Sequence, residues 1–279
     1  MRFVATSLMW LIATVLLALA VPAAWVQQHL VDADGYAALA QKAATNPGLQ
    51  AATAGELTTQ VARLGTGVNT GTVSLVAAGY TSSSAFPGQF AQANRFAHRW
   101  LFTDSVRSSV DPQGRWVIDF APMLSDASFQ QTLSDYNITV PTSVPIPLTD
   151  NAPSALRPGA LRWAASYGPW ASVGLTVLAG VAAVLTLFIA RSRGKMLVAL
   201  GVSALLVGAG GWAAIEFGRR HLNQVLDNTS GNIRRIAEAM VDAAVASMHQ
   251  WLNISLIVGG GLVVIGVIVT LLASLAKSS

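Results

Sequence analysis

Residues 170–215 read WASVGLTVLAGVAAVLTLFIARSRGKMLVALGVSALLVGAGGWAAI, two apolar runs separated by one short basic segment. Each run has about 20 residues, the length of helix that crosses the roughly 30 Å hydrocarbon core of a bilayer. The segment between them, residues 191–195, carries three basic side chains and no acidic one. We therefore predict two transmembrane helices, residues 169–190 and 196–215, joined by a tight turn.

Apolar runs of similar length lie near both ends of the sequence. Residues 1–26 contain one charge, at Arg2, and residues 251–276 contain none. Because Ala18-Leu19-Ala20 resembles a signal-peptidase cleavage site, a cleaved signal peptide is the alternative interpretation of the first run. The run is long for the apolar part of a signal peptide, which favours a retained helix. We therefore predict four transmembrane helices in all.

The charges beside the apolar runs predict the orientation of these helices. Membrane proteins collect basic residues on the cytoplasmic side. We therefore place the turn 191–195 in the cytoplasm, together with Arg2 and the tail 277–279, as an even number of helices requires. Residues 27–168 and 216–250 are then expected on the extracytoplasmic (periplasmic) side of the plasma membrane.

The composition supports a membrane location and argues against a nucleic-acid-binding surface. The chain is 53% hydrophobic and only 11% charged, against roughly 25% charged residues in soluble domains. Its net charge of +4 comes from the residues beside the apolar runs, because residues 27–168 hold eight basic and nine acidic side chains. The positive charge is therefore topogenic. Since there is no cysteine, the chain has no disulfide and no thiolate metal ligand.

The predicted spans offer packing surface and carry no ionisable residue in their interiors. Pumps, channels and secondary transporters place such residues within the membrane, so the chain alone is not expected to move solute. Glycine lets helix backbones approach closely, and the third and fourth spans are rich in it. These glycines pack either within the chain's own bundle or against a foreign subunit. For the second case we name as interface residues Gly208, Gly211 and Gly260.

The extracytoplasmic domain, residues 27–168, is predicted to be mostly helical with a minor β component. Asp34 is expected to cap a helix over residues 35–44, and Pro47 to open the next helix. Ser82-Ser83-Ser84 belongs to a Gly/Thr/Ser-rich stretch that we interpret as loop. The further predicted elements are helices over 47–64, 87–102 and 122–136, a strand over 115–120 and an extended segment over 138–148.

Residues 216–250 are predicted to form a helical hairpin that prolongs the third and fourth transmembrane helices. A turn at 227–232 separates its two halves, and apolar residues then recur at helical spacing over 233–248. This stripe either packs on the extracytoplasmic domain as core, the commoner use of an amphipathic face, or docks a partner. For the docking hypothesis we assign to the interface Ile233, Ile236, Met240 and Val241.

The sequence shows no constellation typical of catalysis, metal binding or cofactor binding. The four histidines lack metal-ligand spacing, and no nucleophile elbow, phosphate-binding loop or dinucleotide fingerprint occurs. His98 lies in an aromatic-rich predicted helix without an orienting acid, so we interpret it as a hydrogen-bonded structural histidine. We therefore assign no catalytic, cofactor-binding or metal residue.

Several short motifs of the chain resemble a known family. Asp32-Ala33-Asp34-Gly35-Tyr36 precedes Leu39-Ala40 and Asn46-Pro47-Gly48-Leu49-Gln50. An aromatic-rich segment with a histidine follows at 90–100, and a short strand ends in Asp119-Phe120-Ala121-Pro122-Met123-Leu124. With the three later spans and the basic turn, this pattern resembles actinobacterial integral membrane proteins, and most of all the lipid uptake coordinator proteins of mycobacterial MCE transporters.

That resemblance implies a non-catalytic accessory subunit of a membrane lipid-import complex in the mycobacterial cell envelope. Its partners would be the permease and MCE subunits of a lipid ABC transporter, with membrane lipid around them. Two alternatives stay open: a stand-alone envelope receptor or chaperone whose extracytoplasmic domain binds lipid or peptide, and an unrecognised membrane enzyme. The family pattern offers no catalytic residue to carry over.

Overall fold

The computed structural model describes residues 2–64, 69–103, 108–110, 116–119, 145–147, 159–226 and 231–278. The chain divides into two compact units. The first, here called the membrane unit, comprises Met1–Gln27, Pro169–Val225 and Val245–Ser279. The second, here called the inserted unit, comprises Gln28–Gly168 and Leu226–Ala244.

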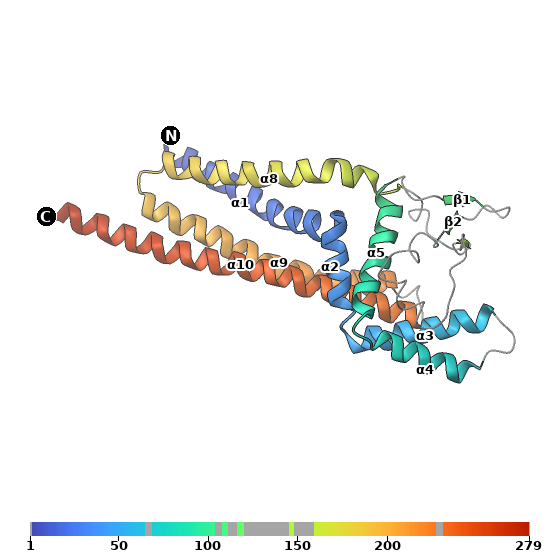
Figure 1. Ribbon diagram of the computed structural model, residues 1–279. Helices are drawn as coiled ribbons and strands as arrows, with labels where there is room; N and C mark the ends of the chain where they lie inside the picture. Colours follow the sequence, from blue (N-terminus) through green and yellow to red (C-terminus); the bar gives the residue numbers. More distant parts are fainter. Residues whose placement is uncertain are drawn as a thin grey trace. The chain divides into compact units, whose positions relative to one another are not determined.

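Four helices of the described residues are long and apolar enough to cross a membrane, so the chain is a multi-pass membrane protein. They run alongside one another (Figure 1) and cover the four predicted spans. Their bounds are α1 Arg2–Val26, α8 Arg162–Ile189, α9 Arg193–Leu226 and α10 Gly231–Ser278. The predicted connection between α8 and α9 is present but shorter than predicted: it comprises residues 190–192, and Arg193 and Lys195 lie in the first turn of α9.

The last two helices continue well beyond the length that a bilayer requires. Helix α10 has 48 residues, which at 1.5 Å per residue is about 70 Å, more than twice the hydrocarbon thickness. Helix α9 likewise runs through Glu216 to Leu226 without a break. Gly231, at the start of α10, has a φ of 68°, a left-handed conformation that glycine adopts without strain. The expected prolongation of both helices over 216–250 is therefore present in the described residues.

Helix α1 is tied to α9 by polar groups within the apolar surface. The Trp10 indole Nε1 donates to the Ala199 carbonyl at 3.0 Å, and the Thr14 and Ser203 hydroxyls lie 2.7 Å apart. Each hydroxyl also lies within hydrogen-bonding distance of a carbonyl four residues earlier on its own helix, so the hydroxyl that accepts from the other donates its own proton to that carbonyl. No polar group at this contact is left without a partner, as a low-dielectric surrounding requires.

The inserted unit is built mainly from two pairs of helices. Helix α1 continues into a π-helical turn, η1 Gln27–Val31, which precedes α2. Helix α2 packs against α5, and α3 lies beside α4 (Figure 1). Their bounds are α2 Ala33–Ala43, α3 Pro47–Leu64, α4 Thr70–Thr81 and α5 Phe86–Phe102. The helices predicted over 47–64 and 87–102 are confirmed.

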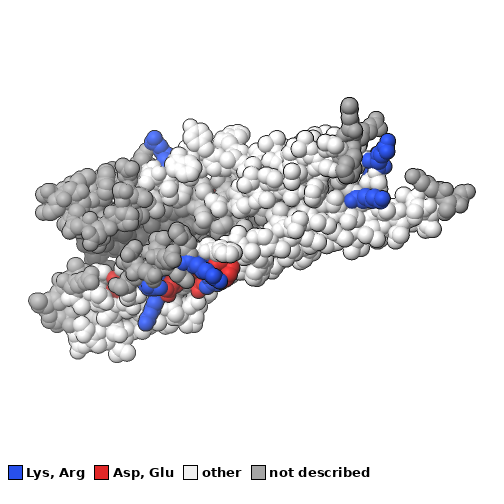
Figure 2. Space-filling view, turned by 180° about the vertical axis from the view of Figure 1, so that it is seen from behind, with Lys and Arg blue, Asp and Glu red and all other residues white. Residues whose placement is uncertain are grey.

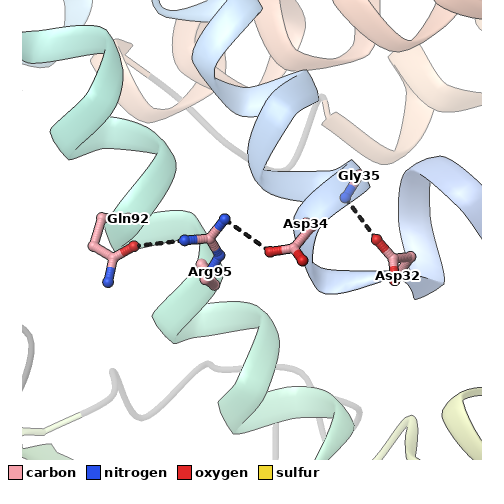
Figure 3. Close-up of polar contacts among 5 residues, drawn as sticks. All are labelled: Asp32, Asp34, Gly35, Gln92 and Arg95. Atoms are coloured by element: carbon pink, nitrogen blue, oxygen red, sulfur yellow. Dashed lines mark hydrogen bonds and ion pairs between the residues drawn. The ribbon is translucent and has the colours of Figure 1, made fainter.

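The cap of α2 was assigned to the wrong aspartate. Asp32 is the N-cap, and its carboxylate accepts a hydrogen bond from the Gly35 backbone N–H at 2.8 Å. Asp34 lies inside the first turn, where its carboxylate pairs with the Arg95 guanidinium of α5 at 2.9 Å (Figure 3). Asp34 therefore contributes to the contact between α2 and α5, and Asp32 caps the helix. Gly35 is required here because a Cβ would collide with the Gln28 carbonyl oxygen.

Helix α4 occupies part of the stretch that composition predicted as loop, and that part of the prediction is wrong. Asn69 caps it by accepting hydrogen bonds from the backbone N–H groups of Gly71 and Thr72 at 2.9 and 3.2 Å. Ala77 and Thr81 are buried, and α4 packs along α3. Tertiary packing therefore outweighs the low helix propensity of glycine and threonine. Ser82-Ser83-Ser84 does form the turn that was predicted.

A small antiparallel sheet has the strand order β1-β2-β3. The strands are β1 Ser108–Val110, β2 Trp116–Asp119 and β3 Pro145–Pro147. Ile118 pairs with Ser108 on one side and with Ile146 on the other. The predicted strand 115–120 contains β2, and the predicted extended segment contains β3. The helix predicted over 122–136 lies outside the described residues.

The core of the inserted unit joins segments that are distant in sequence. Ala43, Ala44, Leu49 and Phe86 form a buried cluster at the α2–α3 corner and the start of α5. Tyr80 and Phe90 pack against this cluster, and so do three residues of α10, Ala239, Met240 and Ala243. The first part of α10 is therefore a structural element of the inserted unit.

Candidate partner interface

Helices α9 and α10 meet along a seam of glycines spaced seven residues apart. Gly194, Gly201 and Gly208 lie on α9, and Gly259 and Gly266 lie on α10. The contacts are reciprocal: a Cβ at Gly201 would lie 2.7 Å from the Gly259 carbonyl oxygen, and a Cβ at Gly259 would lie 2.8 Å from the Gly201 oxygen. Gly194 and Gly266 face each other in the same way. A seven-residue repeat keeps one face of each helix toward its partner along the whole contact.

The seam accounts for two of the glycines assigned to a partner. A Cβ at Gly208 would lie 2.6 Å from a methyl carbon of Leu256, and one at Gly211 would lie 2.5 Å from a methyl carbon of Leu252. Leu252 is itself buried, with 1% of its surface exposed. Both glycines therefore pack inside the chain's own bundle. This packing within the bundle was the first of the two interpretations that the sequence left open.

The opposite side of α10 carries no such contacts. A Cβ at Gly260 or Gly261 would meet no described atom within 4 Å. Gly261 shares a helix face with large exposed apolar side chains, and together they recur at i, i+4, i+7, i+11 and i+14. We call this the open face of α10; it comprises Ile257, Gly261, Val264, Ile268 and Leu271. Gly260 lies beside it, and its assignment to a partner interface stays a prediction.

The apolar stripe at the start of α10 divides between core and surface. Met240 packs on the cluster at the α2–α3 corner. Ile233 is 53% exposed, while Ile236 and Val241 are half-buried. Asn232, which precedes Ile233, lies close to Gly55 of α3: a Cβ at Gly55 would lie 2.9 Å from the side-chain amide of Asn232. Met240 therefore takes the core role that the sequence also allowed, and the assignment of Ile233, Ile236 and Val241 to a docking interface stays a prediction.

His98 joins α5 to the turn before α2. Its side chain is only 5% exposed, and its Nε2 lies 3.0 Å from the Leu30 carbonyl oxygen, to which the neutral imidazole donates. The ring stacks on Phe102 with centroids 4.0 Å apart and contacts Tyr36 at 5.3 Å. Burial lowers the pKa of His98, which favours this neutral form. The prediction that His98 is hydrogen-bonded is confirmed, and its structural role stays a prediction.

Polar side chains also join α5 to α2 and to α4. Arg95 bridges the helices, because its guanidinium contacts Asp34 of α2 and also donates to the Gln92 amide oxygen at 3.0 Å (Figure 3). Nearby, the Tyr80 hydroxyl donates to the Gln89 amide oxygen at 2.7 Å, and burial raises the pKa of Tyr80 to about 12. These contacts position helices; they do not assemble a nucleophile with a base.

Within the described ranges, no three His, Asp or Glu side chains gather where they would hold a metal ion. The chain has no cysteine to supply thiolate ligands instead. The assignment of no catalytic, cofactor or metal residue remains a prediction.

Comparisons with protein families, curated proteins and solved structures identified no relative of the chain. No family model, curated protein or solved structure matches the chain. The resemblance to lipid uptake coordinators therefore rests on the short motifs quoted above.

Proposed function

We propose that this chain is a non-catalytic accessory subunit of a lipid-import complex of the MCE type. It crosses the plasma membrane four times with both termini in the cytoplasm, and its inserted unit lies on the extracytoplasmic side. Its partners are the permease and MCE subunits of that transporter.

The open face of α10 is the observation that carries this proposal. The glycine seam satisfies the packing of α10 on one side, yet on the other side Ile257 is 73% exposed and Gly261 leaves room for close approach. Membrane helices associate through such small-residue surfaces because van der Waals contact drives their packing. A transmembrane helix of a permease fits a face of this kind.

The chemistry of the spans supports an assembly role over a transport role. None of the four apolar runs contains a charged residue in its interior. A path for solute through the membrane needs polar or ionisable groups along it. The contacts between α1 and α9 use hydroxyl and indole groups that are already paired within the chain. Transport in the complex is therefore assigned to the permeases.

The test uses the tagged full-length chain, expressed in its native host and extracted in mild detergent. Gly261→Leu adds a bulky side chain on the open face, at a position with no described atom within 4 Å. We expect the unchanged chain to bring permease and MCE subunits with it. The variant should recover about a tenth as much, since one misfit in a packed interface costs about 1–3 kcal/mol.

The matched control is Gly174→Leu on α8, because a Cβ at Gly174 also meets nothing within 4 Å. It should recover the partners as the unchanged chain does. Recovery of the unchanged chain without any permease or MCE subunit would contradict the accessory role. Equal recovery with both variants would remove the open face of α10 from the interface.

A further inference from the structure

The membrane unit has a groove at the end where α8 and α9 are joined. It has a volume of about 860 Å³ and lies between the first turns of α1, the end of α8 and the start of α9. Two basic side chains line it, Arg191 and Lys195, together with the hydroxyls of Ser7 and Ser192. Figure 2 shows basic side chains gathered at this end of the bundle, with no acidic side chain beside them.

The glycine seam determines which charges of the turn face the groove. Gly194 is buried against α10, where a Cβ would lie 2.8 Å from the Gly266 carbonyl oxygen. This contact sets the rotation of the first turn of α9. As a result Ser192 and Lys195 line the groove toward α1, whereas Arg193, one position before the buried glycine, does not.

No acidic side chain of the membrane unit is able to neutralise this groove. The only acidic residue in the sequence of that unit is Glu216. It follows Lys195 by 21 positions on the same helix, a separation of about 30 Å at 1.5 Å per residue. The ion pairs Asp34–Arg95 and Arg234–Glu238 both lie in the inserted unit. The membrane unit therefore supplies no carboxylate side chain to Arg191 and Lys195.

The walls of the groove below the two basic side chains would suit the apolar part of an amphipathic anion. Trp10, Ile189 and Met196 line it, so its surface is largely apolar below the charges. The Trp10 indole is held in place because its Nε1 donates to the Ala199 carbonyl at 3.0 Å. A free anion would leave this apolar surface uncovered, whereas an acyl chain would cover it.

We propose that the groove binds one anionic phospholipid. Its phosphate lies between Arg191 and Lys195 and accepts hydrogen bonds from the neighbouring serine hydroxyls, and an acyl chain lies over Trp10 and Met196. Basic pockets between transmembrane helices recognise anionic headgroups in this way. The inference goes beyond the accessory role and does not depend on it, because any membrane rich in anionic lipid supplies the ligand.

The test measures phosphatidylglycerol bound to the purified full-length chain by native mass spectrometry in detergent, where the orientation in a membrane plays no part. The variant is R191Q/K195Q, and the matched control, which removes the same total charge, is R193Q/K277Q. We expect about 30-fold weaker binding for the first variant, since each basic group near a lipid surface contributes about fivefold. The control should bind within about twofold of the unchanged chain.

Three further measurements decide between the possible ligands. Met196→Trp, which fills the groove without changing charge, should also lose phosphatidylglycerol. Phosphatidylcholine and inorganic phosphate should neither bind comparably nor compete. Equal losses in R191Q/K195Q and R193Q/K277Q, or unchanged binding in both, would overturn the proposal. Displacement of the lipid by inorganic phosphate would overturn it in favour of a simple anion site.

Discussion

Gly259 and Gly261 are two residues apart on α10 and have opposite surroundings. A Cβ at Gly259 would lie 2.8 Å from the Gly201 carbonyl oxygen, whereas a Cβ at Gly261 would meet nothing within 4 Å. Successive residues of a helix differ by about 100° in direction, so two positions turn a side chain to nearly the opposite face. The comparison teaches that glycine in these spans has two functions: it closes the chain's own bundle on one face and leaves the other face open.

The largest effect is expected where the seam is blocked. Gly201→Leu places a side chain against the backbone of α10, so α9 and α10 must separate. We expect a loss of about 3 kcal/mol or more in the free energy of unfolding, the upper range for overpacking. Thermal unfolding in detergent measures it, with Gly261→Leu as control, which should change stability by about 0.5 kcal/mol or less. Equal destabilisation by both would erase the distinction between the two faces.

A similar contrast exists in the first part of α10, within the inserted unit. Met240 packs on the buried cluster and Ile233 is 53% exposed. Met240→Asp should cost about 2–3 kcal/mol, because it brings an unpaired carboxylate against apolar side chains. Ile233→Asp should leave stability within about 0.5 kcal/mol and reduce partner recovery if this position docks. Protease resistance of the inserted unit reports the first effect. A stable Met240→Asp chain would show that α10 is not part of that core.

Two neighbouring aspartates give a smaller contrast of the same kind. Asp32→Ala removes the N-cap of α2 and should cost about 1 kcal/mol. Asp34→Ala removes an ion pair whose carboxylate is 85% exposed, and such pairs contribute about 0–1 kcal/mol. The difference between the two variants in thermal unfolding checks the cap assignment. The reverse order would return the capping role to Asp34.

The smallest effect on folding stability is expected from the protonation of His98 as the pH falls. Burial lowers the pKa of His98 from 6.5, while the hydrogen bond to Leu30 and the charge of Asp32 oppose this. Because the folded-state pKa lies below the unfolded value, the stability from neutral His98 is complete above about pH 6.5. It is lost as the pH falls toward the folded-state pKa. His98→Gln keeps a donor for the Leu30 carbonyl and does not titrate. Its unfolding temperature should therefore decline less between about pH 7 and pH 5 than that of the unchanged chain.

The elements predicted well are those specified by local sequence. The four apolar runs, the basic turn and the helices opened by Pro47 and Pro87 follow from length, charge and proline position. Helix α4 was missed because Gly71, Gly79 and three threonines hide its signal, which was Asn69 followed by apolar residues at 73, 77 and 80. The paired groups Thr14 and Ser203 were missed because nothing in either run identifies the other as its partner.

The sequence by itself determined that four helices are apolar enough to enter a membrane and that basic residues gather at one set of their ends. Transfer of a side chain from water to lipid depends on that side chain, so the contributions add along a run without knowledge of the fold. Only the tertiary structure decided that Gly208 and Gly211 pack internally, that a Cβ at Gly260 would meet no described atom and that Met240 belongs to a core. Each of these depends on the rotation of one helix about its axis, which neighbouring helices determine through close packing.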